Sequence, residues 1–133
     1  MSDELAGRYL AALSAGDLAG MLALFADDAV VHSPLYGVLP AREFYPLLFA
    51  DTGSANLTLL GTMRGRSASD AELLSFWFHF DWILPDGTAA PFHVVDVAEL
   101  DDRGRISTLR IVYDTVGVRP AHEAGTGRPS VRP

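Results

Sequence analysis

The stretch that decides the fold is LLSFWFHFDWILPDGTAAPFHVVDVAEL, residues 73–100 of a chain of 133 residues. Two apolar runs, rich in aromatic and β-branched residues, flank the segment Pro85-Asp86-Gly87-Thr88, which is typical of a β-hairpin turn. Successive side chains of a strand point to opposite faces. We therefore expect two long antiparallel strands, over residues 73–84 and 92–100, each with two distinct faces.

The sequence before this hairpin predicts helices. Leu5, Tyr9 and Leu13 have helical spacing, Gly16 ends that helix, and Asp17 is placed to cap a second one. Further elements are expected as a strand over 29–32, a short helix over 42–49, and strands over 56–63 and 106–115. Helices followed by antiparallel strands predict an α+β fold, with the helices packed on one face of a curved sheet.

The chain is long enough for one domain with its own core, and we expect that domain over residues 1–117. From Gly117 onward, Gly, Pro and Arg accumulate and apolar residues become sparse. This composition predicts a loose C-terminal tail over residues 118–133.

Composition excludes several classes of function. The net charge of −7 disfavours nucleic acid and anionic membranes as partners, and no apolar run is long enough to cross a bilayer. The absence of cysteine and lysine excludes thiolate chemistry and Schiff bases. The four histidines lack metal-ligand spacing, so we expect no metal and no cofactor. No signal peptide is evident at the start, and a cytoplasmic protein is expected.

Asp96 is the strongest candidate for a functional residue. It shares one face of its strand with Phe92, Val94, Ala98 and Leu100, all of which are apolar. A carboxylate on such a face is costly unless it is paired, hydrogen-bonded or protonated. This placement points to a site.

The register of the hairpin decides which side chains lie beside Asp96. A turn with an even number of residues places Trp77 opposite Asp96 and puts His79 and Asp81 on the same face, whereas an odd loop inverts this assignment. The next turn places Leu109 opposite Asp96, with Ile111 and Tyr113 on the same side. The other face of the long strand would then carry four large aromatic residues: Phe76, Phe78, Phe80 and Trp82. Such a patch predicts a subunit contact, so we expect a homodimer through the outer face of the sheet.

Four stretches carry a family resemblance over about residues 5–118. They are RYLAAL (8–13) with AGDL (15–18), FADDAVVHSP (25–34), REFY (42–45), and VVDV (94–97) with residues 101–106. In these stretches the chain resembles ketosteroid isomerase-like proteins and SnoaL-like polyketide cyclases. Both groups have the nuclear-transport-factor-like, or cystatin-like, fold. The resemblance implies a cone in which the curved antiparallel sheet wraps around the N-terminal helices and encloses an apolar pocket.

The resemblance also implies roles for individual residues. Tyr9 matches the tyrosine, and Asp96 the protonated aspartic acid, that form the oxyanion hole of ketosteroid isomerases. Tyr45 resembles the second tyrosine that supports the first. The isomerases carry their proton-shuttling aspartate where this chain has Ser33. Because a serine hydroxyl is no base near neutral pH, His79 or Asp81 is expected to replace it. This acid–base pairing is similar to the aspartate and histidine of SnoaL-like cyclases.

Together with the position of Asp96, the resemblance implies a cofactor-independent acid–base enzyme, a cyclase or isomerase. Its substrate would be a small apolar carbonyl compound of polyketide or steroid type in natural-product metabolism. The expected catalytic residues are Asp96, Tyr9, His79 and Asp81. The expected substrate-binding residues are Ser33, Tyr45, Trp77, Phe92, Val94, Leu109 and Tyr113. Two alternatives remain: a cone protein that binds a small ligand without catalysis, and an epoxide hydrolase-like enzyme or epoxide-opening cyclase, which would require an arginine in the pocket.

Overall fold

The computed structural model describes residues 2–132. The elements follow one another as α1 (Ser2–Ala15), α2 (Leu18–Leu22), β1 (Phe25–Ser33), β2 (Gly37–Pro40), α3 (Ala41–Ala50), β3 (Ser54–Arg66), β4 (Glu72–Ile83), β5 (Phe92–Leu100), β6 (Ile106–Val112) and α4 (Thr115–Thr126). This is the α+β fold expected from the sequence, with one further strand, β2, and one further helix, α4. None of the helices in this part of the chain is both long and apolar enough to cross a membrane.

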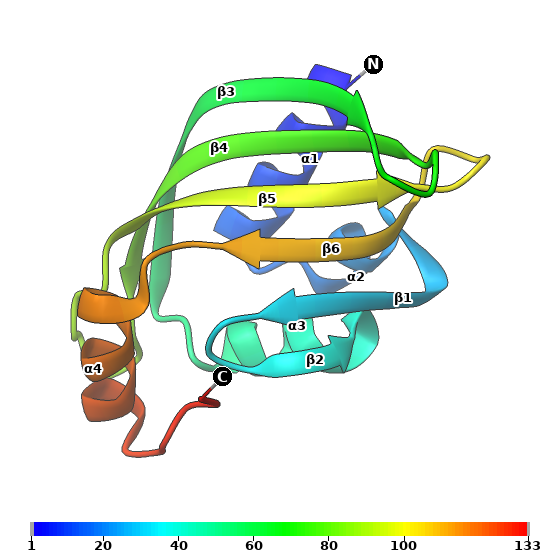
Figure 1. The fold of residues 1–133 in the computed structure, drawn as a ribbon. Coiled ribbons are helices and arrows are strands. Elements are labelled where there is room, and N and C mark those ends of the chain that lie inside the picture. The colour runs from blue at the N-terminus through cyan, green and yellow to red at the C-terminus, as the bar shows by residue number, and fades with distance from the viewer. Residues whose placement is uncertain (1, 133) are drawn as a thin grey trace.

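The six strands form one sheet in the order β2-β1-β6-β5-β4-β3. All neighbouring strands are antiparallel except β1 and β6, which are parallel. Figure 1 shows the sheet curving around α1, while α3 lies beside β1 and β2 at the other end of the concave side. The sheet does not close into a barrel, so its concave side and the helices enclose the interior between them.

The helix ends follow the signals in the sequence. Gly16 ends α1 with a φ of 65°, a left-handed conformation that costs glycine little. The Asp17 side chain accepts a hydrogen bond from the Gly20 amide at 3.0 Å and caps α2. These local contacts define where α1 ends and where α2 begins.

The C-terminal segment is a helix where the composition favoured a loose tail. The Asp114 side chain accepts a hydrogen bond from the Val116 amide at 2.9 Å, and Gly127 ends α4 with a φ of 71°. Two side chains of this helix, Val118 and His122, are buried. The signals for both caps are present in the sequence, but the helix between them was not predicted because Gly117 and Pro120 have low helix propensity. Strand β6 accordingly ends at Val112, before the expected end at residue 115.

The register between β4 and β5 contradicts the one predicted. Phe76, and not Trp77, lies opposite Asp96, because Ile83 bridges Ala89 and leaves an odd number of residues, 84–88, in the loop. An odd loop moves every side chain of the strand to the other face. The aromatic face of β4 is therefore the inner face of the sheet, and its prediction as a subunit interface is wrong.

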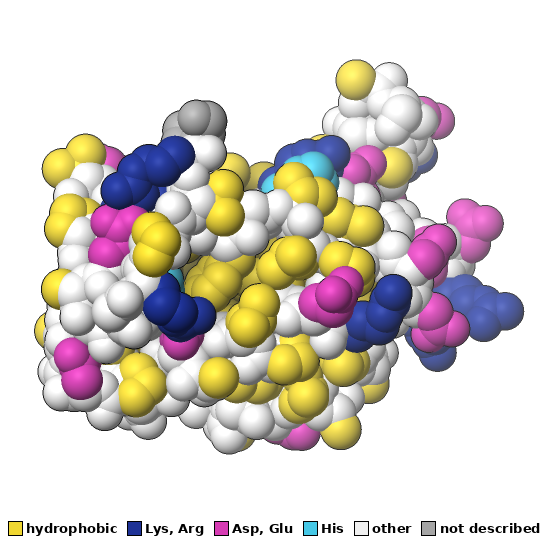
Figure 2. Space-filling model, turned by 90° about the horizontal axis from the view of Figure 1, so that it is seen from below, with side chains coloured by type: hydrophobic (Ala, Val, Ile, Leu, Met, Phe, Trp, Pro, Cys, Tyr) yellow, Lys and Arg dark blue, Asp and Glu magenta, His cyan; other side chains and the backbone are white. Residues whose placement is uncertain are grey.

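The core lies between this inner face and the helices. The largest fully buried side chains are Trp82, Tyr9, Tyr45, Phe44, Phe76, Phe78, Met21, Leu35, Leu74, Leu84, Ile106 and Leu109. Figure 2 shows the molecule from below, from the end where β2 and α3 lie in Figure 1; hydrophobic side chains gather across the middle of this side and charged side chains lie around them. On the outer face of β4, by contrast, Trp77 is 42% exposed.

Candidate active site

Asp96 lies on the concave face of β5, between Phe76 on β4 and Ile111 on β6. Its side chain is only 1% exposed, and burial raises the pKa of its carboxyl group to about 8. A hydrogen bond from Tyr9 has the smaller, opposite effect and lowers this pKa. Among residues 2–132, Oδ1 of Asp96 has no hydrogen-bond partner. Asp96 is thus a carboxylic acid that keeps its proton at neutral pH and has one oxygen unused by the protein.

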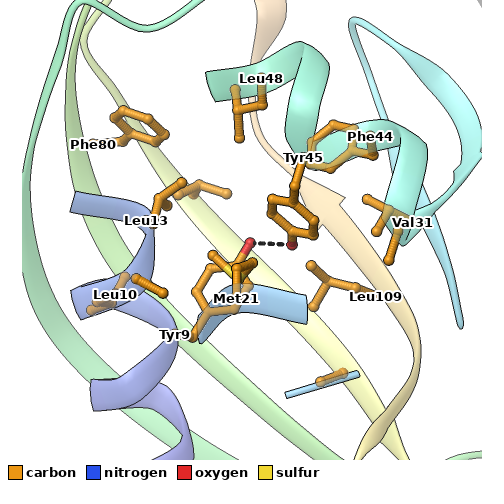
Figure 3. Close-up of a cluster of buried hydrophobic side chains, with 14 of the residues drawn as sticks. Tyr9, Leu10, Leu13, Met21, Val31, Phe44, Tyr45, Leu48, Phe80 and Leu109 are labelled. Carbon is orange, nitrogen blue, oxygen red and sulfur yellow. Dashed lines mark hydrogen bonds between the residues drawn. The ribbon is translucent and has the colours of Figure 1, made fainter. Parts of the chain in front are cut away.

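Tyr9 and Tyr45 form a buried hydroxyl pair next to Asp96. Tyr9 comes from α1 and Tyr45 from α3, and Figure 3 shows their hydroxyl groups pointing toward each other. The two hydroxyl oxygens are 2.8 Å apart. Burial raises the pKa of both tyrosines well above the ordinary value, so both stay protonated. The hydroxyl of Tyr45 therefore supports that of Tyr9, which interacts with Asp96.

A narrow pocket opens beside Asp96. It is lined by Tyr9, Leu13, Ser33, Tyr36, Phe44, Leu48, Phe78, Phe80, Trp82, Phe92, Val94, Asp96, Ile111 and Tyr113. Most of this wall is aromatic or aliphatic, and polar atoms are few. Pockets of this kind bind apolar small molecules, with orientation set by the few polar groups.

The structure brings some of the predicted site residues together and separates others. Ser33, Phe92, Val94 and Tyr113 line the pocket with Tyr9 and Asp96, whereas Leu109 is fully buried in the core behind it. Leu109 shares the face of Asp96 as predicted, but its partner on β5 is Ala98. The odd loop closed by Leu100 and Ile106 shifts the register by one residue, and a bulge near Glu99 shifts it by one more, so the face is kept.

Trp77, His79 and Asp81 lie on the outer face of β4, away from the pocket, in contrast to the prediction. The odd loop that inverted the register is the reason. The ring of His79 packs against that of His93, with 4.9 Å between the ring centres. Neither His79 nor Asp81 is therefore in position to exchange protons with a molecule bound beside Asp96.

A second polar cluster, which the sequence analysis missed, lies where α4 meets the pocket wall. Tyr36 lines the pocket, and its hydroxyl donates a hydrogen bond to Oδ2 of Asp51 at 2.6 Å. Nε2 of His122 is 3.0 Å from the Tyr36 oxygen, and Arg128 binds Oδ1 of Asp51. The ring of His122 stacks on Trp82, and burial lowers the pKa of this imidazole. The four residues come from a turn, the end of α3, α4 and the segment after it, so no spacing in the sequence links them.

The curved sheet, the helices beneath it and the buried acid at an apolar pocket define a pocket protein of the α+β cone class. A family model described as the SnoaL-like domain matches residues 6–109. The chain therefore belongs to the SnoaL-like domain family.

Solved structures of the same fold are similar over most of the chain. An LEH-like epoxide hydrolase from M. tuberculosis is 21% identical with a TM-score of 0.68, covering 95% of this chain and 92% of its own. SalBIII, described as an epoxide hydrolase/cyclase-like enzyme in pyran ring formation in polyether salinomycin, is 16% identical with a TM-score of 0.67, over 87% and 92%. An NTF2-like protein of unknown function from Exiguobacterium sp. 255-15 is 18% identical with a TM-score of 0.65, over 83% and 98%. At these identities the likeness establishes the fold.

Proposed function

We propose that this protein is a cofactor-independent acid–base enzyme, an isomerase or cyclase, that acts on an apolar polyketide- or steroid-like carbonyl compound in natural-product metabolism. The observation that carries the proposal is the buried Oδ1 of Asp96, which has no partner among residues 2–132 and belongs to a residue that lines the pocket. A buried polar atom without a partner is costly, and a bound ligand oxygen would satisfy it.

Asp96 and Tyr9 would act on the oxygen where negative charge develops. Proton removal next to a carbonyl group places charge on the carbonyl oxygen, and donors fixed in an apolar pocket stabilise that charge strongly. A protonated Asp96 can donate from its carboxyl group, and Tyr9 is held beside it by Tyr45. This arrangement is similar to the oxyanion hole of ketosteroid isomerases, in which a neutral carboxylic acid has the same task.

Ligand binding without catalysis is the second candidate, and Ser33 favours it. The Ser33 hydroxyl, at the position where isomerases carry their base, accepts hydrogen bonds from the amides of Leu35 and Tyr36, each at 3.2 Å. It therefore holds a turn and does not replace the missing base. Epoxide hydrolysis has less support, because the pocket lining within residues 2–132 includes no arginine.

Binding of 2-naphthol tests the donor pair. Its fused rings suit the aromatic lining, and its phenolate oxygen would accept hydrogen bonds from Tyr9 and protonated Asp96. Because the pKa of Asp96 is raised to about 8, a rise in pH through this value replaces the donor by a carboxylate that repels the phenolate. Fluorescence titrations on both sides of pH 8, corrected for ionisation of the naphthol itself, should therefore show affinity for the phenolate falling as the pH rises.

The matched control for this titration is Asp96→Asn, which has no proton to lose and should remove the step near pH 8. A wild-type protein that binds 2-naphthol at no pH, or equally well on both sides of the step, would contradict a neutral Asp96 as donor.

We also propose a homodimer through the outer face of the sheet, where Met63, Trp77 and Val112 are exposed. Large exposed apolar side chains on one face are typical of a contact surface. Sedimentation velocity should find a dimer that Trp77→Asp converts to a monomer. Val116→Asp, at an apolar residue of α4 that is 81% exposed, should remain dimeric. A monomeric wild type, or a Trp77→Asp dimer, would rule out this contact.

A further inference from the structure

Tyr36 lies on the turn that follows β1, on the wall of the pocket that Asp96 lines. Ser33 fixes this turn, since its hydroxyl accepts hydrogen bonds from the amides of Leu35 and Tyr36. Arg119 of α4 donates to the Pro34 carbonyl oxygen at 3.1 Å and ties the helix to the same turn. The residue at the usual base position thus holds in place a neighbouring tyrosine that lines the pocket.

The hydroxyl of Tyr36 is connected to an acceptor for protons. Asp51 is 8% exposed, and its Oδ2 accepts the hydrogen bond from Tyr36 at 2.6 Å. This distance is typical of hydrogen bonds from a hydroxyl group to a carboxylate, which are shorter than those between neutral groups. Arg128 binds the other oxygen, Oδ1, and balances the charge of the buried carboxylate.

His122 orients the tyrosine. The Tyr36 hydroxyl has one proton, and it goes to Asp51, so Nε2 of His122 is the donor in the 3.0 Å contact with the Tyr36 oxygen. The same nitrogen also lies 3.5 Å from Oδ2 of Asp51. Burial lowers the pKa of His122, which keeps the imidazole neutral, and its ring is stacked on Trp82. A hydroxyl oxygen has two lone pairs. The second lone pair of Tyr36 is left for a molecule in the pocket.

We propose that Tyr36 and Asp51 are the second acid–base group of this pocket and supply the base that Ser33 does not. This inference rests on the proposed function and deepens it, because it assigns the group that removes a proton from the carbon next to the carbonyl group of an apolar ketone. Tyr36 is the catalytic residue that touches the substrate, and Asp51 acts through it as a positioning and proton-accepting residue.

The C–H bond next to the carbonyl group breaks, and its proton goes to the Tyr36 oxygen while the hydroxyl proton of Tyr36 goes to Oδ2 of Asp51. The electron pair of the C–H bond moves to the carbonyl oxygen, which Asp96 and Tyr9 stabilise as an enolate or enol. Reversal of the relay returns a proton to the same carbon or to another one. Burial and Asp51 raise the pKa of Tyr36 far above its ordinary value, so the two transfers occur together and no free phenolate forms.

Deuterium exchange of 2-tetralone in D₂O, followed by proton NMR, tests this relay without the natural substrate. The wild-type protein should exchange the protons next to the carbonyl group faster than buffer of the same pD. Tyr36→Phe and Asp51→Asn should each lower the protein-dependent rate by about 100-fold or more. The double variant should lose little beyond the worse single variant, since the two residues act as a unit.

Two further measurements separate a catalytic role from a structural one. Tyr36→Phe and Asp51→Asn should bind 2-naphthol within about threefold of the wild type, because the Asp96 donor is intact; a loss in chemistry with unchanged binding is the mark of a base. Asp17→Asn is the matched control. It exchanges one carboxylate for an amide at the cap of α2, where either side chain serves, and should leave exchange unchanged.

The outcomes distinguish this inference from the function on which it rests. Wild-type exchange rates in Tyr36→Phe and Asp51→Asn, together with a loss in Asp96→Asn, would overturn the relay and leave the proposed function standing. A wild-type protein that binds 2-naphthol but exchanges no faster than buffer would overturn both and favour a binding protein. Should Asp51→Asn fail to fold, Tyr36→Phe decides alone, because it retains the Asp51–Arg128 ion pair.

Discussion

Replacing Asp96 by asparagine is expected to lower the protein-dependent exchange of 2-tetralone by about 10²–10³-fold, the usual effect of losing one donor to a developing oxyanion. The asparagine amide has nearly the same shape but is a far weaker acid than a protonated carboxyl group. It therefore stabilises an enolate less. The measurement is the initial rate of deuterium incorporation at a pD below the raised pKa of about 8, where the wild-type residue holds its proton.

Asp81→Asn is the matched control for this prediction. Asp81 lies on the outer face of β4, one strand away from Asp96, and lines no part of the pocket. Its replacement should leave the exchange rate unchanged. If Asp96→Asn kept the full rate while its thermal unfolding resembled that of the wild type, Asp96 would not be the acid of this site.

Replacing Trp82 by alanine is expected to lower the free energy of unfolding by about 3–5 kcal/mol, the usual cost of removing a large buried aromatic side chain. Trp82 is 1% exposed, stacks on His122 with 5.4 Å between the ring centres, and donates a hydrogen bond to the Thr52 hydroxyl at 2.9 Å. Its loss would leave a cavity between the sheet and α4. Urea denaturation gives the change directly.

Trp77 provides the control on the same strand. It has the opposite orientation and is 42% exposed, so Trp77→Ala should lower the stability of the monomer by only about 1 kcal/mol or less. Because Trp77 also lies in the proposed dimer contact, both variants are compared at a protein concentration too low for dimers to form. The difference between the two tryptophans measures which face of β4 is buried. Equal effects, or a larger effect at Trp77, would contradict the register that places the aromatic face inside.

The sequence predicted those parts of the molecule that depend on local signals. Asp17 and Gly16 marked the ends of helices, and alternation in residues 92–100 identified Asp96 as a carboxyl group on an apolar face. The family resemblance then placed Tyr9 and Tyr45 near that carboxyl group, and the structure has the two hydroxyls 2.8 Å apart. Cap chemistry and period-two alternation act within a few residues, which is why they can be read directly from the chain.

The features that the sequence did not predict correctly all depend on contacts between segments that are distant in the chain. A difference of one residue in the hairpin loop decided whether His79 or Phe78 faces the pocket, and the loop sequence alone did not fix that length. The polar cluster joins residues up to 92 positions apart, from Tyr36 to Arg128, through a helix that the composition concealed. Its members can be recognised only when the position of α4 against the rest of the fold is known.

The position of α4 also bears on how such proteins diversify. The match to the SnoaL-like domain ends at residue 109, whereas α4 begins at Thr115 and adds no strand to the sheet. A segment that adds no strand to the sheet can vary in evolution without a change in the order of the strands. His122 and Arg128, which it contributes, complete the environment of a tyrosine that belongs to the scaffold. Changes in α4 and the segment after it would therefore alter the surroundings of Tyr36 and leave the carboxyl group on β5 in place.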